Sequence, residues 1–164
     1  MAFAARIVGG IVLVAVVVGI GLWAERQTDD DLVLPDEVAG LALDDSAAGR
    51  EFTDTHSAGL SEAYDDAEAV TALYGPDSDP GSQLLVSAVR AGSGPPAPEV
   101  FTKDQDWVEQ DDVECLVDHV RKRSDSILCQ RRDGDLTVQV VAAGPDAEVD
   151  VLVDAANEVW EDLS

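Results

Sequence analysis

Residues 127–142 read Ile127-Leu-Cys-Gln-Arg-Arg-Asp-Gly-Asp-Leu-Thr-Val-Gln-Val-Val-Ala142, and this stretch decides the fold. The Asp133-Gly134 dipeptide at its centre strongly favours a type I′ turn between two antiparallel strands. After the turn, apolar and polar residues alternate from Leu136 to Ala142, which is the period of a strand with one buried face. We therefore predict a β-hairpin with strands over 127–131 and 136–142.

Further strands are expected before this hairpin. From Val113 to Asp118 apolar residues alternate with acidic ones, which indicates a half-exposed strand. Residues 83–90 are largely apolar and predict a buried strand. The acidic stretch 103–112 around Trp107 is ambiguous, and we interpret it as a helical turn. Residues 32–43 contain Pro35 and predict an edge strand or an extended lead-in.

Two helices are expected to flank these strands. Apolar residues recur at helical spacing over 59–74, where Gly75-Pro76 is a stop signal. The last helix is expected over 145–163, with an apolar stripe and with Pro145 at its first position. The Asp-, Ser- and Gly-rich residues 44–55 predict a loop, and the Gly- and Pro-rich residues 92–98 predict an irregular connector.

This order of elements predicts an α+β domain over residues 32–164. It comprises a helix, a strand, a three-strand meander and a final helix. We expect a two-layer sandwich in which an antiparallel sheet carries the helices on one face.

Residues 7–24 predict a transmembrane anchor. They contain no charge, and as a helix they would span ~27 Å, close to the ~30 Å of a hydrocarbon core. Arg6 precedes the run and acidic residues follow it, so residues 1–6 are expected to be a cytoplasmic tail. Residues 25–31 would then be a stalk that leads to an extracytoplasmic domain. The alternative is a cleaved signal peptide, although the run is long and its cleavage sites are poor.

The charge of the chain narrows the classes of partner. The 164 residues include 34 Asp and Glu against 10 Lys and Arg, for a formal net charge of −24. Phosphates and anionic lipid headgroups would be repelled by such a surface, which argues against a nucleic-acid partner. Contact with lipid is expected only through residues 7–24.

Cys115 and Cys129 are the only cysteines of the chain, and outside the cytoplasm an even number predicts a disulfide. If the two pair across neighbouring antiparallel strands, Val117 faces Ile127 and the apex falls at 121–123. A redox pair would need Cys-x-x-Cys, which is absent. A zinc site formed with His56 and His119 matches no common spacing. A third interpretation keeps the domain in the cytoplasm with free thiols.

A basic cluster is the candidate contact for a partner. It comprises Arg121, Lys122, Arg123, Arg131 and Arg132. The stretch 118–132 carries a net charge of +3 inside a strongly acidic segment, so an envelope protein or a polyanion could bind there. The alternative is that these side chains pair with carboxylates on the protein's own surface.

We find no motif for catalysis, for a metal or for a cofactor. The chain has no Gly-x-Ser-x-Gly elbow, no HExxH motif and no phosphate-binding glycine loop. Asp and Glu residues are too abundant for any pair of them to indicate chemistry. The leading hypothesis is a noncatalytic domain that binds or supports an envelope partner, and the alternative is an envelope hydrolase that uses carboxylates.

Four features together resemble a family of proteins. They are the N-terminal anchor, the motif Leu34-Pro-Asp-Glu-Val-Ala-Gly40, the motif Ala72-Leu-Tyr-Gly75, and Cys115…Cys129 followed by a hairpin and a helix. This pattern resembles uncharacterised membrane-anchored or exported proteins of actinobacteria that have a two-cysteine extracytoplasmic domain. The family has no assigned activity, so the resemblance implies no role for any residue.

Overall fold

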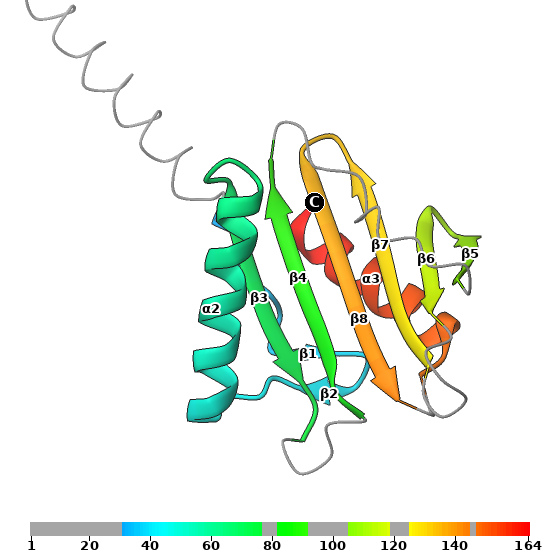
Figure 1. The fold of residues 1–164 in the computed structure, drawn as a ribbon, viewed down its shortest axis with the longest axis horizontal. Coiled ribbons are helices and arrows are strands. Elements are labelled where there is room, and N and C mark those ends of the chain that lie inside the picture. The colour runs from blue at the N-terminus through cyan, green and yellow to red at the C-terminus, as the bar shows by residue number, and fades with distance from the viewer. Residues whose placement is uncertain (1–30, 77–81, 92–104, 119–124, 145–146) are drawn as a thin grey trace, which may run out of the picture. The chain divides into compact units, whose positions relative to one another are not determined.

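The computed structural model describes residues 31–76, 82–91, 105–118, 125–144 and 147–164, and Leu32–Ser164 form one compact unit. In chain order the elements are β1 (Glu37–Val38), β2 (Leu41–Ala42), α2 (Ala47–Ala63), β3 (Glu68–Tyr74), β4 (Leu84–Arg90), β5 (Gln105–Gln110), β6 (Val113–Asp118), β7 (Asp125–Asp133), β8 (Leu136–Gly144) and α3 (Val149–Leu163). The larger sheet has the order β3-β4-β8-β7-β6-β5 (Figure 1), and every neighbouring pair in it is antiparallel.

The hairpin predicted around Asp133-Gly134 is confirmed. β7 and β8 pair along their whole length, from Asp125↔Gly144 to Asp133↔Leu136. Gly134 lies in the left-handed region at φ 60°, which glycine adopts without strain. The strands predicted over 83–90 and from Val113 to Asp118 are also present, as β4 and β6. The α+β class and the antiparallel sheet are therefore confirmed.

The helix predicted over 59–74 is wrong. The helix α2 ends at Ala63, and the chain then forms the strand β3. Asp65 and Asp66 take positive φ angles of 57° and 61°, which a right-handed helix cannot contain. Val70 and Leu73 are spaced as on one side of a helix, but in β3 they point to opposite faces of the sheet.

Two neighbouring predictions also need correction. Residues 44–55 are not a loop, because α2 begins at Ala47, where the Ser46 hydroxyl accepts a hydrogen bond of 3.0 Å from the Gly49 N–H. Residues 103–112 do not form a helical turn, because β5 pairs with β6 through Trp107↔Leu116. Residues 77–81, 92–104, 119–124 and 145–146 lie outside the described residues, and so does the predicted connector at 92–98.

The main core lies between the sheet and α3. The predicted apolar stripe of α3 is confirmed, but the helix begins at Val149 after the N-cap Glu148, so the predicted start at Pro145 is wrong. The buried residues of α3 are Leu152, Val153, Ala155, Ala156, Val159 and Trp160. They pack against every second side chain of the central strands. Val86 of β4 and Val138 and Val140 of β8 are examples, and all three are fully buried. No residue of α2 belongs to this core cluster as the described residues define it.

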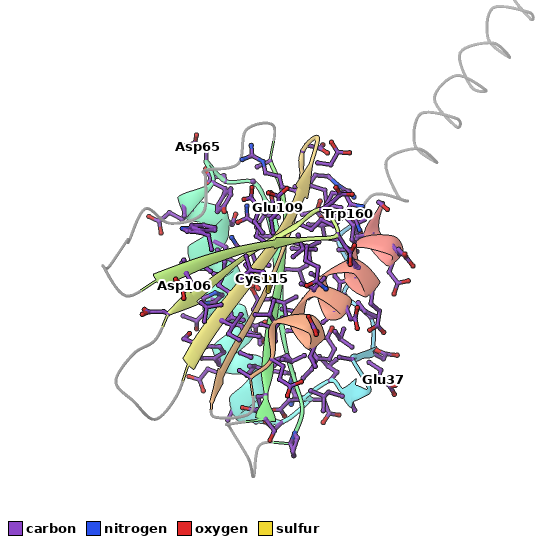
Figure 2. The ribbon with its side chains drawn as sticks, turned by 90° about the vertical axis from the view of Figure 1, so that its right-hand side faces the viewer. Glu37, Asp65, Asp106, Glu109, Cys115 and Trp160 are labelled. Carbon is purple, nitrogen blue, oxygen red and sulfur yellow. A yellow bond between two sulfur atoms is a disulfide. The ribbon has the colours of Figure 1, made fainter. Side chains whose placement is uncertain are left out.

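The two helices lie on opposite faces of the sheet, as Figures 1 and 2 show from perpendicular directions. The expectation that both cover one face is therefore wrong. The reason is visible in β4, where Val86 and Ala88 face α3 while Val89, also buried, points to the other side. A strand that is apolar on both sides needs cover on both, and α2 packs over β3 and β4 to provide part of it.

Tyr74 joins the sheet to the lead-in segment. Its ring is fully buried, and its hydroxyl donates a hydrogen bond of 2.7 Å to the Pro35 carbonyl oxygen. Burial raises the pKa of the Tyr74 phenol well above its usual value, and the nearby charges of Asp36 and Glu158 raise it further. Tyr74 therefore stays neutral over the physiological range.

Within the described part of the chain, no helix is long and apolar enough to cross a membrane. The predicted anchor at 7–24, the tail at 1–6 and most of the stalk at 25–31 lie outside that part. All three remain predictions from the sequence.

Candidate functional site

The disulfide between Cys115 and Cys129 is present, with an S–S distance of 2.07 Å. β6 and β7 place the two residues directly opposite each other, and the predicted pairing Val117↔Ile127 is confirmed by the same register. Both cysteines are 0% exposed and belong to the core beneath α3. The predicted apex at 121–123 lies outside the described residues.

The zinc alternative does not fit this geometry. Both sulfur atoms are bound to each other, and His56 lies on α2, on the opposite side of the sheet from the disulfide. Among the residues that the structure describes, no group of three or more His, Cys, Asp or Glu could hold a metal ion. His119 is outside them.

The Arg131 side chain contacts α3 at Trp160, which is labelled in Figure 2, and at Asn157. Its guanidinium lies over the Trp160 ring, 5.0 Å from the centroid, and donates a hydrogen bond of 2.6 Å to Asn157 Oδ1. The side chain is half-buried. Arg131 therefore links β7 to the last helix, which is a contact within the domain.

Arg132 points to the other face of the sheet, because successive residues of a strand alternate. It is exposed, and its charge acts on Tyr64 at the end of α2. Burial raises the pKa of the Tyr64 phenol, and the positive charge of Arg132 opposes that rise. The two members of the predicted cluster that the structure describes, Arg131 and Arg132, thus lie on opposite faces of the sheet.

The other three members of the predicted cluster, residues 121–123, lie outside the described residues. Residues 121–123 precede Asp125, the first residue of β7, while Arg131 and Arg132 stand near its last residue. A strand rises about 3.3 Å per residue, so roughly 20 Å separate Asp125 from Arg131. Because the positions of residues 121–123 are not described, the structure leaves the predicted cluster untested, and a role of any of its members in binding remains a prediction.

A row of polar side chains crosses the sheet on the face that α2 partly covers. Strand pairing aligns Thr71 with Ser87, Ser87 with Gln139, and Gln139 with Gln130. The Thr71 and Ser87 hydroxyls are 3.1 Å apart, and Gln139 Nε2 donates to Gln130 Oε1 over 2.9 Å. Among the described residues no buried side-chain nitrogen or oxygen lacks a partner. The row is therefore internally satisfied.

The helix α2 turns small and polar side chains toward the sheet. Gly49 is its one buried residue, and a Cβ at that position would lie 2.9 Å from the Asp44 carboxyl carbon. The hydroxyls of Thr53 and Ser57 are half-buried and donate to carbonyl oxygens of the helix itself, at 3.1 and 2.8 Å. This interface needs no apolar stripe, which is why the sequence pattern did not reveal the helix.

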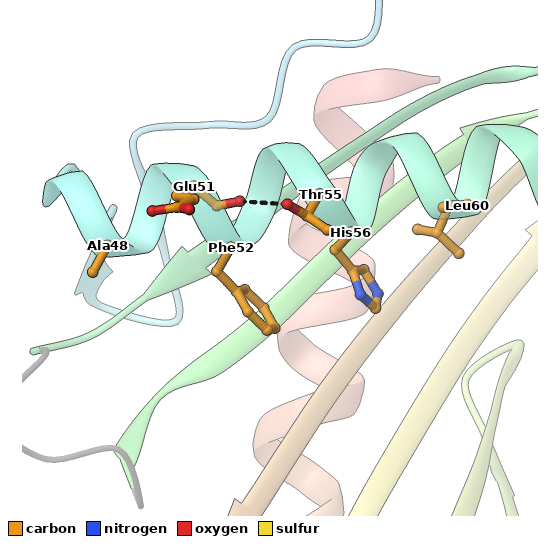
Figure 3. Close-up of a pocket in the computed structure, with 7 residues that line it drawn as sticks. Ala48, Glu51, Phe52, Thr55, His56 and Leu60 are labelled. Carbon is orange, nitrogen blue, oxygen red and sulfur yellow. Dashed lines mark hydrogen bonds between the residues drawn. The ribbon is translucent and has the colours of Figure 1, made fainter.

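The two large apolar side chains of α2, the exposed Phe52 and the half-buried Leu60, lie along its flank instead. We define the α2 flank as Ala48, Glu51, Phe52, Thr55, His56, Gly59 and Leu60. Figure 3 shows Phe52, His56 and Leu60 projecting from the same side of the helix. A hollow of about 550 Å³ runs beside them, and every described residue that lines it belongs to α2. Sequence analysis missed this surface because it assigned residues 44–55 to a loop.

A second hollow, of about 310 Å³, lies between the lead-in segment, the start of α2 and β3. Asp44 and Asp45 both line it, which is the kind of carboxylate pair that a hydrolase would use. Asp44 Oδ1, however, accepts a hydrogen bond of 3.0 Å from the Ser46 N–H, and the Arg50 guanidinium donates to the Asp45 carbonyl oxygen. These contacts shape the start of α2, and a hydrolase remains a prediction without a supporting contact.

Comparison of the chain with known protein families, with curated proteins and with solved structures finds no match. The resemblance to actinobacterial anchored or exported proteins therefore remains a prediction.

Proposed function

We propose that the chain is a noncatalytic, membrane-anchored domain that lies outside the cytoplasm and binds a partner in the cell envelope. The disulfide between Cys115 and Cys129 carries this proposal. Stable disulfides form in oxidising compartments and are rare in the cytosol. A fully buried bond that joins two neighbouring strands is a structural feature, and it supports a domain that folds outside the cytoplasm.

The N-terminal sequence supports the same compartment. An uncharged run over 7–24 that follows Arg6 is expected to leave the basic end inside and to export the rest. A cleaved secreted form would place the domain in the same compartment.

The α2 flank supports a binding role. Phe52 is 49% exposed and lies beside the hollow that the α2 flank lines. The ring stacks on His56, with centroids 5.9 Å apart. An aromatic residue presented on a regular helix is a typical anchor for a protein partner.

Thiol labelling tests the compartment. Intact cells that express the full chain are denatured in the presence of a thiol-alkylating reagent, with and without prior reduction. We expect Cys115 and Cys129 to be labelled only after reduction. Quantitative labelling of both cysteines without reductant would support the cytoplasmic alternative and would overturn the proposal.

A further inference from the structure

We infer that the α2 flank is a docking surface for a basic, amphipathic helix of a partner protein. This inference rests on the proposed binding function and names the surface and the chemistry of the partner. Three observations carry it: the helical spacing of Ala48, Phe52, His56 and Leu60, the hollow beside them and the charge of the helix that presents them.

The spacing fits a helical partner. Ala48, Phe52, His56 and Leu60 follow each other at intervals of four residues, so they form one ridge along α2. At about 1.5 Å per residue the ridge is roughly 18 Å long, which corresponds to about three helical turns. Ridges of this kind pack into the grooves of another helix.

A hollow lies next to this ridge, and among the described residues only those of α2 line it. The residues one position before its members are Glu51, Thr55 and Gly59, and the hollow extends over them. A Cβ built at Gly59 would meet no atom of the described residues within 4 Å. The hollow thus extends over the row from Glu51 to Gly59, where side chains of a partner helix could enter it.

The charge around the flank selects the partner. Glu51 lies within the flank, and residues 44–66, which comprise α2 and its two ends, contain seven carboxylates in all and one guanidinium, which already contacts the Asp45 carbonyl oxygen. A second copy of this chain would bring the same carboxylates against them, and anionic lipid would also be repelled. A helix with apolar residues on one side and Lys or Arg on its borders complements both the ridge and the charge.

The test uses the full chain in neutral detergent and a fluorescent model peptide of about four helical turns, made of Leu and Lys in an amphipathic pattern. Fluorescence anisotropy gives its Kd for the wild type, for Phe52→Asp and for Val151→Asp. Val151 is a matched control, because it is 43% exposed on α3 and the substitution changes the charge equally. A Glu51→Lys variant tests the contribution of charge.

We expect Phe52→Asp to raise the Kd of the peptide by about tenfold or more relative to the wild type. Glu51→Lys should also raise the Kd relative to the wild type, and the effect should be larger at low salt. Val151→Asp should leave the Kd unchanged. Equal affinities for the two Asp variants would show that only diffuse charge holds the peptide, and would overturn the inference. So would a peptide that does not bind. Either result leaves the thiol-labelling experiment to decide the proposed function, so the two can fail separately.

Discussion

Reducing the bond between Cys115 and Cys129 is expected to lower the free energy of unfolding by about 3 kcal/mol. The two cysteines are 14 residues apart in sequence. In the chain-entropy model, a bond that closes a loop of about 15 residues restricts the unfolded chain by about this amount. For a domain of this size, that loss lowers Tm by roughly 10–15 °C.

Urea unfolding of the full chain in detergent, followed by tryptophan fluorescence, measures this change. The oxidised protein, the reduced protein and the double variant Cys115→Ala/Cys129→Ala are compared. The reduced protein keeps its sulfur atoms, so its difference from the oxidised protein isolates the cross-link. The double variant should be less stable still, because both sulfur atoms are fully buried and their removal leaves cavities.

A difference of less than about 0.5 kcal/mol between oxidised and reduced protein would refute this reasoning. It would mean that the β6–β7 hairpin is already formed in the unfolded chain, so that the cross-link restricts little.

Three further predictions concern single side chains. Arg131→Met should cost roughly 1–2 kcal/mol, because it removes both the cation–π contact and the hydrogen bond to α3; an unchanged urea midpoint contradicts this. The raised pKa of Tyr74 means that the folded chain keeps a proton that the unfolded chain loses near pH ~10. Stability should therefore fall as the pH rises above that value, and thermal melts of Tyr74→Phe should show a shallower decline. Gly49→Ala should destabilise the domain through its contact with Asp44, whereas Gly59→Ala, which points into open space, should stabilise α2 by about 0.5–1 kcal/mol; two shifts of the same sign would contradict this account of the helix.

Local signals explain what was predictable from the sequence. The Asp133-Gly134 turn sets the register of β7 and β8. The assumption that Cys115 and Cys129 lie opposite each other on neighbouring antiparallel strands sets the register of β6 against β7. The stripe of α3 points into a dry core, so its apolar residues recur at 3.6-residue spacing. In each case the sequence signal and the buried surface coincide.

The helix α2 breaks that correspondence. Its sheet-facing residues, such as Gly49, Thr53 and Ser57, are small or polar, while Phe52 lies on the exposed flank. Apolar residues at helical spacing therefore do not mark the start of the helix. The residues that do show this spacing, over 59–74, span the end of α2 and the strand β3. The Ser46 N-cap was the local signal that could have placed its start.

The candidate site was harder to predict than the fold. Adjacent arginines in a sequence suggest one patch, but a strand sends Arg131 and Arg132 to opposite faces, and Arg131 is engaged with Trp160. The α2 flank could be recognised only after residues 44–55 were known to be helical. The positions of side chains across elements depend on pairings that distant parts of the chain decide.

The compartment of the domain is the central claim, and reporter fusions at Ser164 test it most directly. One fusion carries an alkaline phosphatase that is active only outside the cytoplasm, and the other carries a fluorescent protein that matures only inside. We predict an active phosphatase and no fluorescence from the full chain. Fluorescence with an inactive phosphatase would contradict the account.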